Sequence, residues 1–508
     1  MKINQTCRIF FILLFLITSG CISAPQEKKC NLPQQKSDFH VYEETAFPDS
    51  PFQNFVTNAF IDNTHHYLHV LDIGDDALLA RIHLIRQAQK AIYIQSYIWS
   101  NDESGRLMVY ELVEAAKRGV KVNIILDYLP NNLSTDLIAF FTTVSPNISI
   151  KFYNPNTKNI LPLKLHYLKG LTQFKSLNQR MHNKIFIIDD RVAITGGRNH
   201  QNDYFDRGVN REFKDRDVII IGPVVKKMTG SFGEYWDYPF SIPSQDMAMV
   251  KKFIDNGLYK IRENKSDYDL NDFFTNLESR ADNIAYIEER FTEDLFKVNK
   301  IDFIVDQPGK NSRRSLSGGG EVVDALTEFL TEADERIIIQ TPYLILGNKS
   351  RRFFKALRRK NPDIDILVSS NSLAAADHFY AYAFSYKRKK FYVKKLKWRI
   401  FEFKPRPEDE SLMIDPLDNI AKNEKRFICI HAKTFIVDHD KIYIGSFNLD
   451  PRSANLNTEA GIIVHDEAFT RHVAGNILRD IAPANSWAIG RRPYVPLISH
   501  FSGLMDDL

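Results

Sequence analysis

Apolar and polar positions in the first part of the chain follow a helical period and then a strand period. Four elements are predicted from this pattern, namely a helix at 77–90, a strand at 91–99, a helix at 106–118 and a strand at 120–127. Asn101 or Asp102 can cap the second helix, and Gly119 ends it. A strand, a helix and a second strand in this order predict a βαβ unit and a largely parallel sheet.

The same order of elements returns in the second part of the chain. Here the pattern predicts a helix at 321–335, a strand at 336–345, a helix at 349–360 and a strand at 364–370. Gln95 and Gln340 are 245 residues apart, and His182 and His431 are 249 residues apart. Two pairs of equivalent residues with nearly the same separation indicate a duplicated domain. The sequence therefore predicts an α/β protein of two similar lobes, related by a pseudo-twofold axis, with an active centre at their seam.

The chain of 508 residues is long enough for two or three domains. The predicted segments are a signal peptide at 1–21, a tether and lead-in at 22–65, a first lobe at 66–245, a helical insertion and linker at 246–316, and a second lobe at 317–508. The insertion is predicted because its first part, up to about residue 300, is helix-rich and charged and does not fit the repeat.

The N-terminus has the order of a secretory signal. Lys2 and Arg8 precede an apolar run at 9–17, which is too short for a bilayer that needs about 20 residues. Small residues before Cys21 resemble the bacterial lipoprotein signal, in which this Cys is acylated, although Thr18 stands where that signal usually has Leu. An ordinary cleaved signal and a short uncleaved anchor are the alternatives. We expect an exported, membrane-associated lipoprotein that faces the periplasm.

One sequence pattern occurs twice, as HNKIFIIDDRVAITGGRN at 182–199 and as HAKTFIVDHDKIYIGSFN at 431–448. The matched residues are His182, Lys184, Asp189, Gly196 and Asn199 in the first copy and His431, Lys433, Asp438, Gly445 and Asn448 in the second. His and Lys are two positions apart on a predicted strand, so their side chains point to one spot. The Asp falls in a turn, and the Gly lets the backbone approach a ligand closely.

The repeated His and Lys indicate a catalytic centre for a negatively charged substrate. Core packing needs neither residue twice, because both are costly to bury without a partner. A phosphodiester fits this centre, since a neutral His can act as nucleophile and a protonated His as general acid. Its non-bridging oxygens can be stabilised by Lys184, Lys433, Asn199 and Asn448. Neither step needs a metal or another cofactor, and no cluster has metal-ligand spacing.

Composition narrows the range of partners only slightly. A hydrophobic share of 44% and a charged share of 26% are ordinary for a globular protein. The net charge of +4 and the pI near 8.6 suit anionic partners but are far from the values of a strongly basic nucleic-acid coat protein, so charge alone does not identify the partner. Cys429 lies between two Ile residues and is predicted in a buried strand, with a disulfide to Cys30 as the alternative in an oxidising compartment.

The two motifs resemble the HKD motifs of the phospholipase D superfamily. Their flanks, RMHNK, FKDRDVIIIGPVV and GSFNLDPRSANLNTEAGIIV, are similar to bacterial cardiolipin synthases, most of all to the C-type group. The likeness runs from about Asp76 to Pro483. It implies a phospholipase D fold of two α/β/α sandwich lobes with mostly parallel mixed sheets.

The resemblance also implies roles for the matched positions of the motif. His182 would be the nucleophile that forms a phosphohistidine, and His431 the acid that protonates the departing alcohol and later deprotonates the incoming one. The carboxylates that would orient the two His side chains are Asp215 and Glu459.

The two copies differ at one position, where the first has Gly197 and the second has the hydroxyl of Ser446. The half-sites are therefore chemically unequal. Asp189 and Asp438 belong to the motif and either take part in the reaction or serve only as turn residues.

Four functions are compatible with these residues. A transferase would move a phosphatidyl group to the glycerol hydroxyl of phosphatidylglycerol and make cardiolipin, with phosphatidylethanolamine as a further candidate substrate. A phospholipase D would use water as acceptor and release phosphatidic acid. An exported nuclease and a lipid-binding protein with a dead site are the other two, and the intact His and Lys of both motifs argue against the last. We expect phospholipids and a membrane surface as partners, and no nucleic acid.

Two basic segments accompany the second motif. They comprise Arg351, Arg352, Lys355, Arg358, Arg359 and Lys360, and then Lys387, Arg388, Lys389, Lys390, Lys394 and Lys395. Such segments either face solvent or bind anionic headgroups, where each basic residue contributes about 1 kcal/mol near a charged bilayer.

Overall fold

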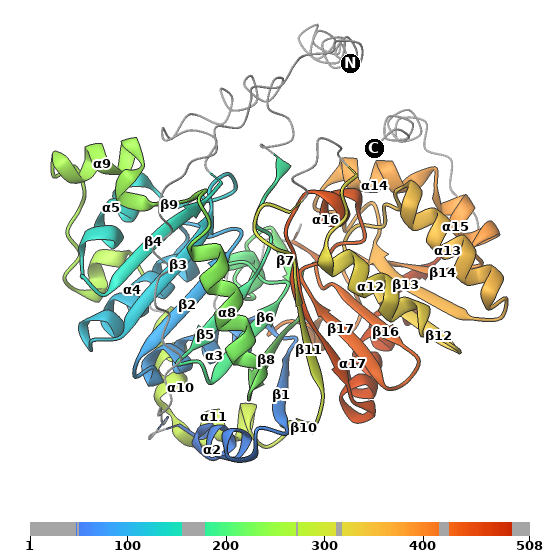
Figure 1. Ribbon diagram of the computed structural model, residues 1–508, viewed down its shortest axis with the longest axis horizontal. Coiled ribbons are helices and arrows are strands. Elements are labelled where there is room, and N and C mark those ends of the chain that lie inside the picture. The colour runs from blue at the N-terminus through green and yellow to red at the C-terminus, as the bar shows by residue number, and fades with distance from the viewer. Residues whose placement is uncertain are drawn as a thin grey trace, which may run out of the picture. The chain divides into compact units, whose positions relative to one another are not determined.

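Each lobe is built on one large mixed β-sheet with helices on both faces (Figure 1). The computed structural model describes residues 47, 50–154, 178–270, 273–310, 317–415 and 426–489. The predicted signal peptide, its proposed lipidation site at Cys21 and Cys30 lie outside these residues. Among the residues described, no helix is long and apolar enough to cross a membrane.

The first sheet has the strand order β10-β1-β8-β6-β5-β2-β3-β4-β9. In that order its strands are Phe296–Val298, His66–Leu71, Asp217–Ile221, Val192–Gly196, Ile185–Ile188, Ala91–Ser96, Lys121–Asp127, Ile148–Tyr153 and Ser241–Pro243. The helices of this part are α2 (Gln53–Asp62), α3 (Gly74–Gln87), α4 (Glu103–Lys117), α5 (Thr135–Thr143), α8 (Val224–Trp236), α9 (Ala248–Asp255), α10 (Phe273–Asp282) and α11 (Ile284–Phe291). Asp102 caps α4 as predicted, through a hydrogen bond from the Gly105 amide.

The second sheet has the order β11-β18-β17-β16-β12-β13-β14-β19. In that order its strands are Ile301–Val305, Ala460–His465, Lys441–Gly445, Thr434–Val437, Arg336–Gln340, Asp365–Asn371, Arg399–Phe403 and Ser486–Ala488. Its helices are α12 (Glu321–Thr331), α13 (Asn348–Lys360), α14 (Phe379–Tyr386), α15 (Lys389–Lys395), α16 (Pro451–Asn455) and α17 (Glu467–Asp480). Short 3-10 helices are η1 (Asn202–Tyr204), η2 (Ser244–Asp246), η3 (Lys265–Tyr268) and η4 (Glu410–Leu412). The duplication predicted from the sequence is confirmed, because both sheets repeat the same central order.

The prediction that the sheets are mostly parallel is wrong. In the part of the chain that the structure describes, only β2, β3 and β4 pair in parallel in the first sheet, and only β12, β13 and β14 in the second. Each motif instead forms a hairpin, β5-β6 or β16-β17, whose strands run antiparallel to their neighbours. A βαβ unit produces parallel strands, whereas a strand that returns through a tight turn can only pair antiparallel.

The strands of the motifs are apolar on both faces because each face meets a different core. In β5, Phe186 and Ile188 pack toward α3 and α4, while Ile185 and Ile187 belong to a cluster that both lobes share. That shared cluster also contains Ile436 of β16 and side chains of α8 and α17. Burial on both faces explains why these strands show continuous apolar runs and no alternation.

A two-stranded ribbon joins the lobes at the seam. It consists of β7 (Arg211–Lys214) from the first lobe and β15 (Phe427–Ile430) from the second, paired in parallel, and Figure 1 shows β7 where the lobes meet. Cys429 is buried in β15, as predicted, and its thiol is free. The ribbon ends directly before His431 and so fixes one motif to the other lobe.

The described part of the segment at 246–316 contributes one strand to each of the two large sheets, besides its helices. It contains helices α9, α10 and α11, but also β10, which pairs with β1, and β11, which pairs with β18. Each strand is an edge strand of a different lobe. Strands of three and five residues next to charged helices leave only a weak pattern in the sequence.

Candidate active site

The two motif His side chains lie at the ends of strands that belong to opposite sheets but meet at the seam. His182 stands two residues before Lys184, which directly precedes β5, and the start of β5 pairs with the end of β2. His431 and Lys433 have the same place before β16, beside the end of β12. The site therefore lies at the carboxyl ends of the central parallel strands.

Each motif His is attached to the other lobe through its backbone. The amide of His182 donates to the carbonyl of Thr458 at 2.9 Å, and the amide of His431 donates to the carbonyl of Lys214 at 2.8 Å. A further contact joins the lobes, since the hydroxyl of Thr458 donates to the carboxamide oxygen of Asn183 at 2.9 Å. These bonds make the two half-sites one rigid centre.

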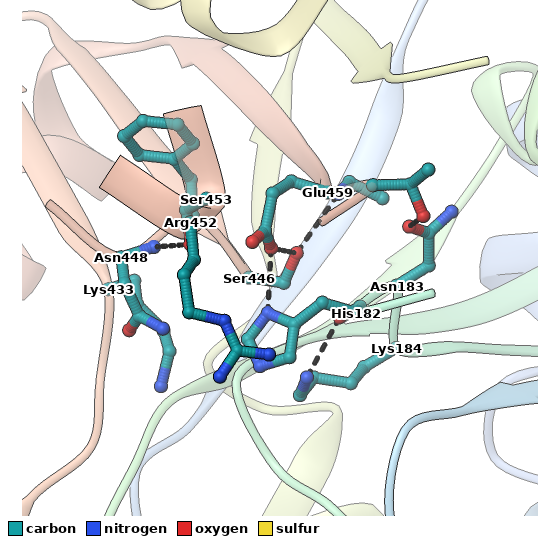
Figure 2. Close-up of polar contacts among 12 residues, drawn as sticks. His182, Asn183, Lys184, Lys433, Ser446, Asn448, Arg452, Ser453 and Glu459 are labelled. Carbon is teal, nitrogen blue, oxygen red and sulfur yellow. Dashed lines mark hydrogen bonds and ion pairs between the residues drawn. The ribbon is translucent and has the colours of Figure 1, made fainter. Parts of the chain in front are cut away.

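The two carboxylates cross between the lobes. Nδ1 of His182 lies 2.8 Å from a carboxylate oxygen of Glu459, and Nδ1 of His431 lies 2.5 Å from a carboxylate oxygen of Asp215. Figure 2 shows the Glu459 carboxylate directed at the His182 ring. Because the carboxylates hold the protons at Nδ1, Nε2 of each ring carries the lone pair for chemistry.

The difference between Gly197 and Ser446 follows from the lengths of the two acids. Ser446 Oγ donates to Glu459 at 2.5 Å and accepts from the amide of Ala460 at 3.0 Å. A Cβ atom added at Gly197 would lie 2.1 Å from a carboxylate oxygen of Asp215. The shorter acid thus occupies the space that a side chain at Gly197 would take, and the hydroxyl has no counterpart in the first lobe.

Burial sets the protonation of the two dyads. It lowers the pKa of His182 and of His431 to about 4, although the facing carboxylates act in the opposite direction. Burial alone would raise the pKa of Glu459 and of Asp215, but the neighbouring His and Lys side chains outweigh it and the pKa of each acid is lowered. Both imidazoles are therefore neutral near pH 7 and both carboxylates are ionised.

The two Lys side chains are buried and differently placed. Lys184 Nζ donates to the carbonyl of His182 at 2.8 Å, and burial followed by the charge of nearby Lys433 lowers the pKa of Lys184 to about 7, against the opposing charge of Glu459. Lys433 Nζ likewise donates to the carbonyl of its own His, but it also lies 2.7 Å from Nδ1 and 3.2 Å from Nε2 of His431. One Lys thus leaves its His ring accessible, while the other contacts the ring of its own motif.

The two motif Asn side chains have different partners. The carboxamide of Asn199 donates to the hydroxyl of Tyr204 at 2.9 Å and accepts from the amide of Ile98, so it positions Tyr204. The hydroxyl of Tyr204 in turn lies 3.4 Å from Nε2 of His431. The carboxamide oxygen of Asn448 is buried without a hydrogen-bond partner. Asn199 is thus committed to Tyr204, whereas the side-chain oxygen of Asn448 has no partner.

The comparison with known families agrees with this geometry. A family model described as cardiolipin synthase, phospholipase D-like domain, matches residues 81–236 and again residues 326–481. The chain belongs to this family. The two matched ranges correspond to the two lobes, and each range contains one motif His and the carboxylate that contacts the His of the other lobe. The chain is an enzyme of the phosphatidyltransferase class.

Relatives of this phospholipase D-like enzyme match over most of its length. It is 33% identical to cardiolipin synthase C of Escherichia coli (strain K12), over 78% of this chain and 80% of that one. It is 31% identical to an uncharacterized protein of Helicobacter pylori (strain ATCC 700392 / 26695), over 84% and 81%. Among solved structures, phosphatidylserine synthase of Haemophilus influenzae Rd KW20 matches with a TM-score of 0.57 and 13% identity, over 89% and 96%, which shows a common fold.

Asp189 and Asp438 lie in the hairpin turns, which agrees with the turn role that the sequence left open beside a catalytic one. Both have positive φ in the hairpin turns, at 52° and 53°. The carboxylate of Asp189 accepts from the amides of Gln89, Lys90 and Ala91 before β2. The carboxylate of Asp438 accepts in the same way from residues 334–336 before β12. These acids tie each hairpin to the start of the neighbouring strand, at the end away from the His.

Three side chains near the centre were not predicted from the sequence. Tyr97 packs edge-on against the ring of His182, with ring centroids 4.8 Å apart, and Tyr204 does the same to His431 at 5.1 Å. Arg452 is exposed on α16, and Figure 2 shows its side chain directed toward His182. Their only signal in the sequence is proximity to the motifs, since Arg452 follows Asn448 by four residues.

Proposed function

We propose that this enzyme transfers a phosphatidyl group between phospholipids and makes cardiolipin from phosphatidylglycerol and a second phospholipid. The observation that carries the proposal is the crossed pair of dyads, in which two neutral His rings from different lobes share one buried centre. A double displacement needs one His to hold the phosphatidyl group and another to move protons.

The surroundings of the two rings support His182 as the nucleophile. Its dyad has the additional hydrogen bond from Ser446, and Lys184 is directed at the backbone carbonyl and away from the ring. Nε2 of His431 instead lies close to Lys433 and to the hydroxyl of Tyr204. A nitrogen with such polar neighbours suits proton exchange with an alcohol oxygen.

The reaction then has two balanced steps. Nε2 of His182 forms a bond to phosphorus while the bond from phosphorus to the first alcohol breaks, and His431 gives its proton to that alcohol. In the second step His431 takes the proton from the hydroxyl of phosphatidylglycerol, whose oxygen bonds to phosphorus as the bond to His182 breaks. The negative charge of the bound phosphodiester favours the protonated form of His431 at the start of this sequence.

The charge on the non-bridging oxygens can be stabilised from both lobes. Lys184 and Lys433 supply buried ammonium groups, and Arg452 supplies a guanidinium group at the entrance. Donors that are already in place cost no rearrangement when charge develops in the transition state.

A membrane surface can bind beside α14. Tyr380 is 60% exposed and Phe379 is 37% exposed, and both follow β13 at the same end of the sheet as the active site. The neighbouring basic segment is only partly available, because Lys389 is buried and forms an ion pair with Glu402. We propose that the exposed aromatic and basic side chains contact anionic lipid at the membrane interface.

We also propose that the protein is exported and that Cys21 carries a lipid anchor. The proposal rests on the residues that precede Cys21. Labelled palmitate should enter the protein expressed in a Gram-negative host, and substitution Cys21→Ala should abolish the label and release the protein from the membrane fraction. A membrane-bound, unlabelled protein in both forms would contradict this.

The activity can be tested with vesicles of phosphatidylglycerol and phosphatidylethanolamine in the presence of a chelator. We expect cardiolipin by mass spectrometry, and no product from the His182→Ala or His431→Ala variant. The matched control is His439→Ala, since His439 is 51% exposed in its side chain and lies outside the site. Phosphatidic acid as the only product would show that the enzyme hydrolyses phospholipids and does not transfer the phosphatidyl group. Cleavage of plasmid DNA without lipid turnover would overturn both the transferase and the hydrolase.

A further inference from the structure

A cavity of about 540 Å³ lies in the second lobe between α12, α13 and the sheet. This volume falls in the range of about 300–1,000 Å³ that is usual for small-molecule sites. The buried part of its wall is apolar and includes Leu326, Leu330, Phe354, Phe435, Phe447 and Leu449. An apolar cavity of this size is unusual in a lobe whose core is otherwise packed.

The cavity shares a wall with the active site. Phe447 and Leu449 line it and flank Asn448, whose carboxamide oxygen is buried and unpaired. Pro451, the first residue of α16, also lines the cavity, and Arg452 follows it. Residues of the cavity and of the active site therefore alternate along the stretch 447–452.

The fold itself does not require the cavity, because the first lobe closes the matching space. By motif alignment, Arg198 and His200 stand where the second lobe has Phe447 and Leu449. Arg198 donates to the carbonyls of Leu71 and Asp72 at 2.6 Å, and His200 stacks on Trp99 with ring centroids 4.5 Å apart. The same architecture is filled in one lobe and open in the other.

The entrance of the cavity is polar and has room. Its exposed lining residues include Asp324, Thr327, Lys349 and Arg352. A Cβ atom added at Gly319 or at Gly347 would meet only one atom within 4 Å, at 3.9 and 3.8 Å. An apolar interior behind an entrance with two basic side chains and one acidic side chain matches an amphiphile with an anionic headgroup.

We propose that this cavity binds one acyl chain of a phospholipid substrate while its phosphodiester occupies the His182 and His431 centre. This proposal rests on the proposed function, because it takes a phospholipid as the substrate. It adds the place where one acyl chain of that phospholipid binds, outside the catalytic residues. The cavity adjoins that centre, because its lining residues Phe447, Leu449 and Pro451 flank Asn448 and Arg452 along the chain.

The test uses the full chain with His182→Ala, which cannot consume the probe. Calorimetry would compare monomeric 1-myristoyl-lysophosphatidylglycerol with glycerophosphoglycerol, which has the headgroup and no chain. Val323→Trp and Thr327→Trp would each place an indole in the cavity, because both positions line it. Glu328→Trp is the matched control, since Glu328 is exposed on the same helix and does not line the cavity.

We expect both cavity variants to weaken binding of the lysolipid about tenfold or more, since each excluded methylene contact is worth a factor of about four. Binding of glycerophosphoglycerol should change less than about twofold, and Glu328→Trp should change neither. Thr327 is exposed, so its variant tests the proposal even where Val323→Trp does not fold. Unchanged lysolipid binding in the folded cavity variants would overturn the proposal.

Turnover distinguishes a failure of the cavity from a failure of the proposed function. With catalytic His182 restored, the cavity variants should lose activity on dioleoyl phosphatidylglycerol but keep it on the dibutyryl form. Equal losses of activity on both lipids would overturn the proposal that the cavity binds an acyl chain. If the unsubstituted enzyme converts neither lipid while the cavity variants still lose the lysolipid, the proposed function fails and the cavity assignment stands.

Discussion

The carboxylate of Glu459 in the second lobe lies 2.8 Å from Nδ1 of His182 in the first lobe. Asp215 of the first lobe has the same relation to His431 of the second, at 2.5 Å. Neither lobe therefore contains a complete dyad. The duplicated chain builds two dyads only when its lobes meet, which couples the assembly of the active site to the packing of the seam.

Substitution Glu459→Gln should lower kcat by about 10²- to 10⁴-fold, because the amide can no longer hold the proton at Nδ1 and stabilise the charge that forms on His182. The measurement is the initial rate of cardiolipin formation, with circular dichroism to verify folding. Glu328→Gln is the exposed control and should keep the full rate. A Glu459→Gln enzyme within about threefold of the parent rate would show that the dyad has no part in catalysis.

Substitution Asp189→Ala should affect stability and spare the chemistry. It leaves the amides of Gln89, Lys90 and Ala91 without their acceptor, which should lower the free energy of unfolding by about 1–3 kcal/mol. Urea denaturation measures this, and Asp440→Ala at an exposed turn position should change it by less than about 0.5 kcal/mol. A stable Asp189→Ala enzyme that has lost its turnover would instead restore a direct role for this acid.

Much of the centre could be predicted because its residues recur. His182 and His431, with the Lys two positions later, stand at equal offsets, and buried His and Lys are costly unless they serve a purpose. The duplicated lobes follow from the same repeat. The antiparallel pairing of β5 with β2 could not be derived from the repeat. A strand buried on both faces has the same continuous apolar pattern whether it pairs parallel or antiparallel.

The crossing of the carboxylates and the role of Arg452 depend on three-dimensional packing. Asp215 and His431 are far apart in the sequence, and the ribbon of β7 and β15 brings them together. The role of Asp189 depends on backbone amides before β2, which have no side-chain signal. Such contacts join residues that are far apart in the sequence, so no regular spacing of residues along the chain indicates them.

Substitution Gly197→Ser copies the residue of the second lobe and should nevertheless destroy activity. Its Cβ would lie 2.1 Å from Asp215, so this acid must move away from His431. We expect a loss of at least about 10²-fold in kcat, because the dyad depends on that contact. Gly475→Ala is the matched control, since nothing lies within 4 Å of its Cβ. Full activity of Gly197→Ser would mean that Asp215 does not need its present position.

The pH dependence of kcat/KM should have one limb from a His and one from a Lys. Below about pH 4 the nucleophile His182 gains a proton and is lost. Above that value the acid His431 has to take up a proton as the phosphodiester binds, and above about pH 7 Lys184 also loses the charge that binds phosphate. kcat/KM should therefore rise through the first value and fall more steeply once the pH exceeds the second. Lys184→Arg should move the alkaline limb upward, because a guanidinium stays protonated. An alkaline limb that remains near pH 7 in this variant would assign it to another group.

Substitution Arg452→Ala should raise KM for phosphatidylglycerol and change kcat less. The guanidinium is exposed on α16 and directed toward His182 (Figure 2), so it can attract the phosphodiester before the reaction begins. A charge-assisted hydrogen bond contributes about 1.5–3 kcal/mol, and partial exposure reduces this to roughly a tenfold effect on KM. Added salt should raise KM of the parent enzyme more than that of the variant, since screening removes the same attraction. Arg359→Ala on α13 is the exposed control, and an equal effect of both substitutions would show that the enzyme responds only to its overall charge.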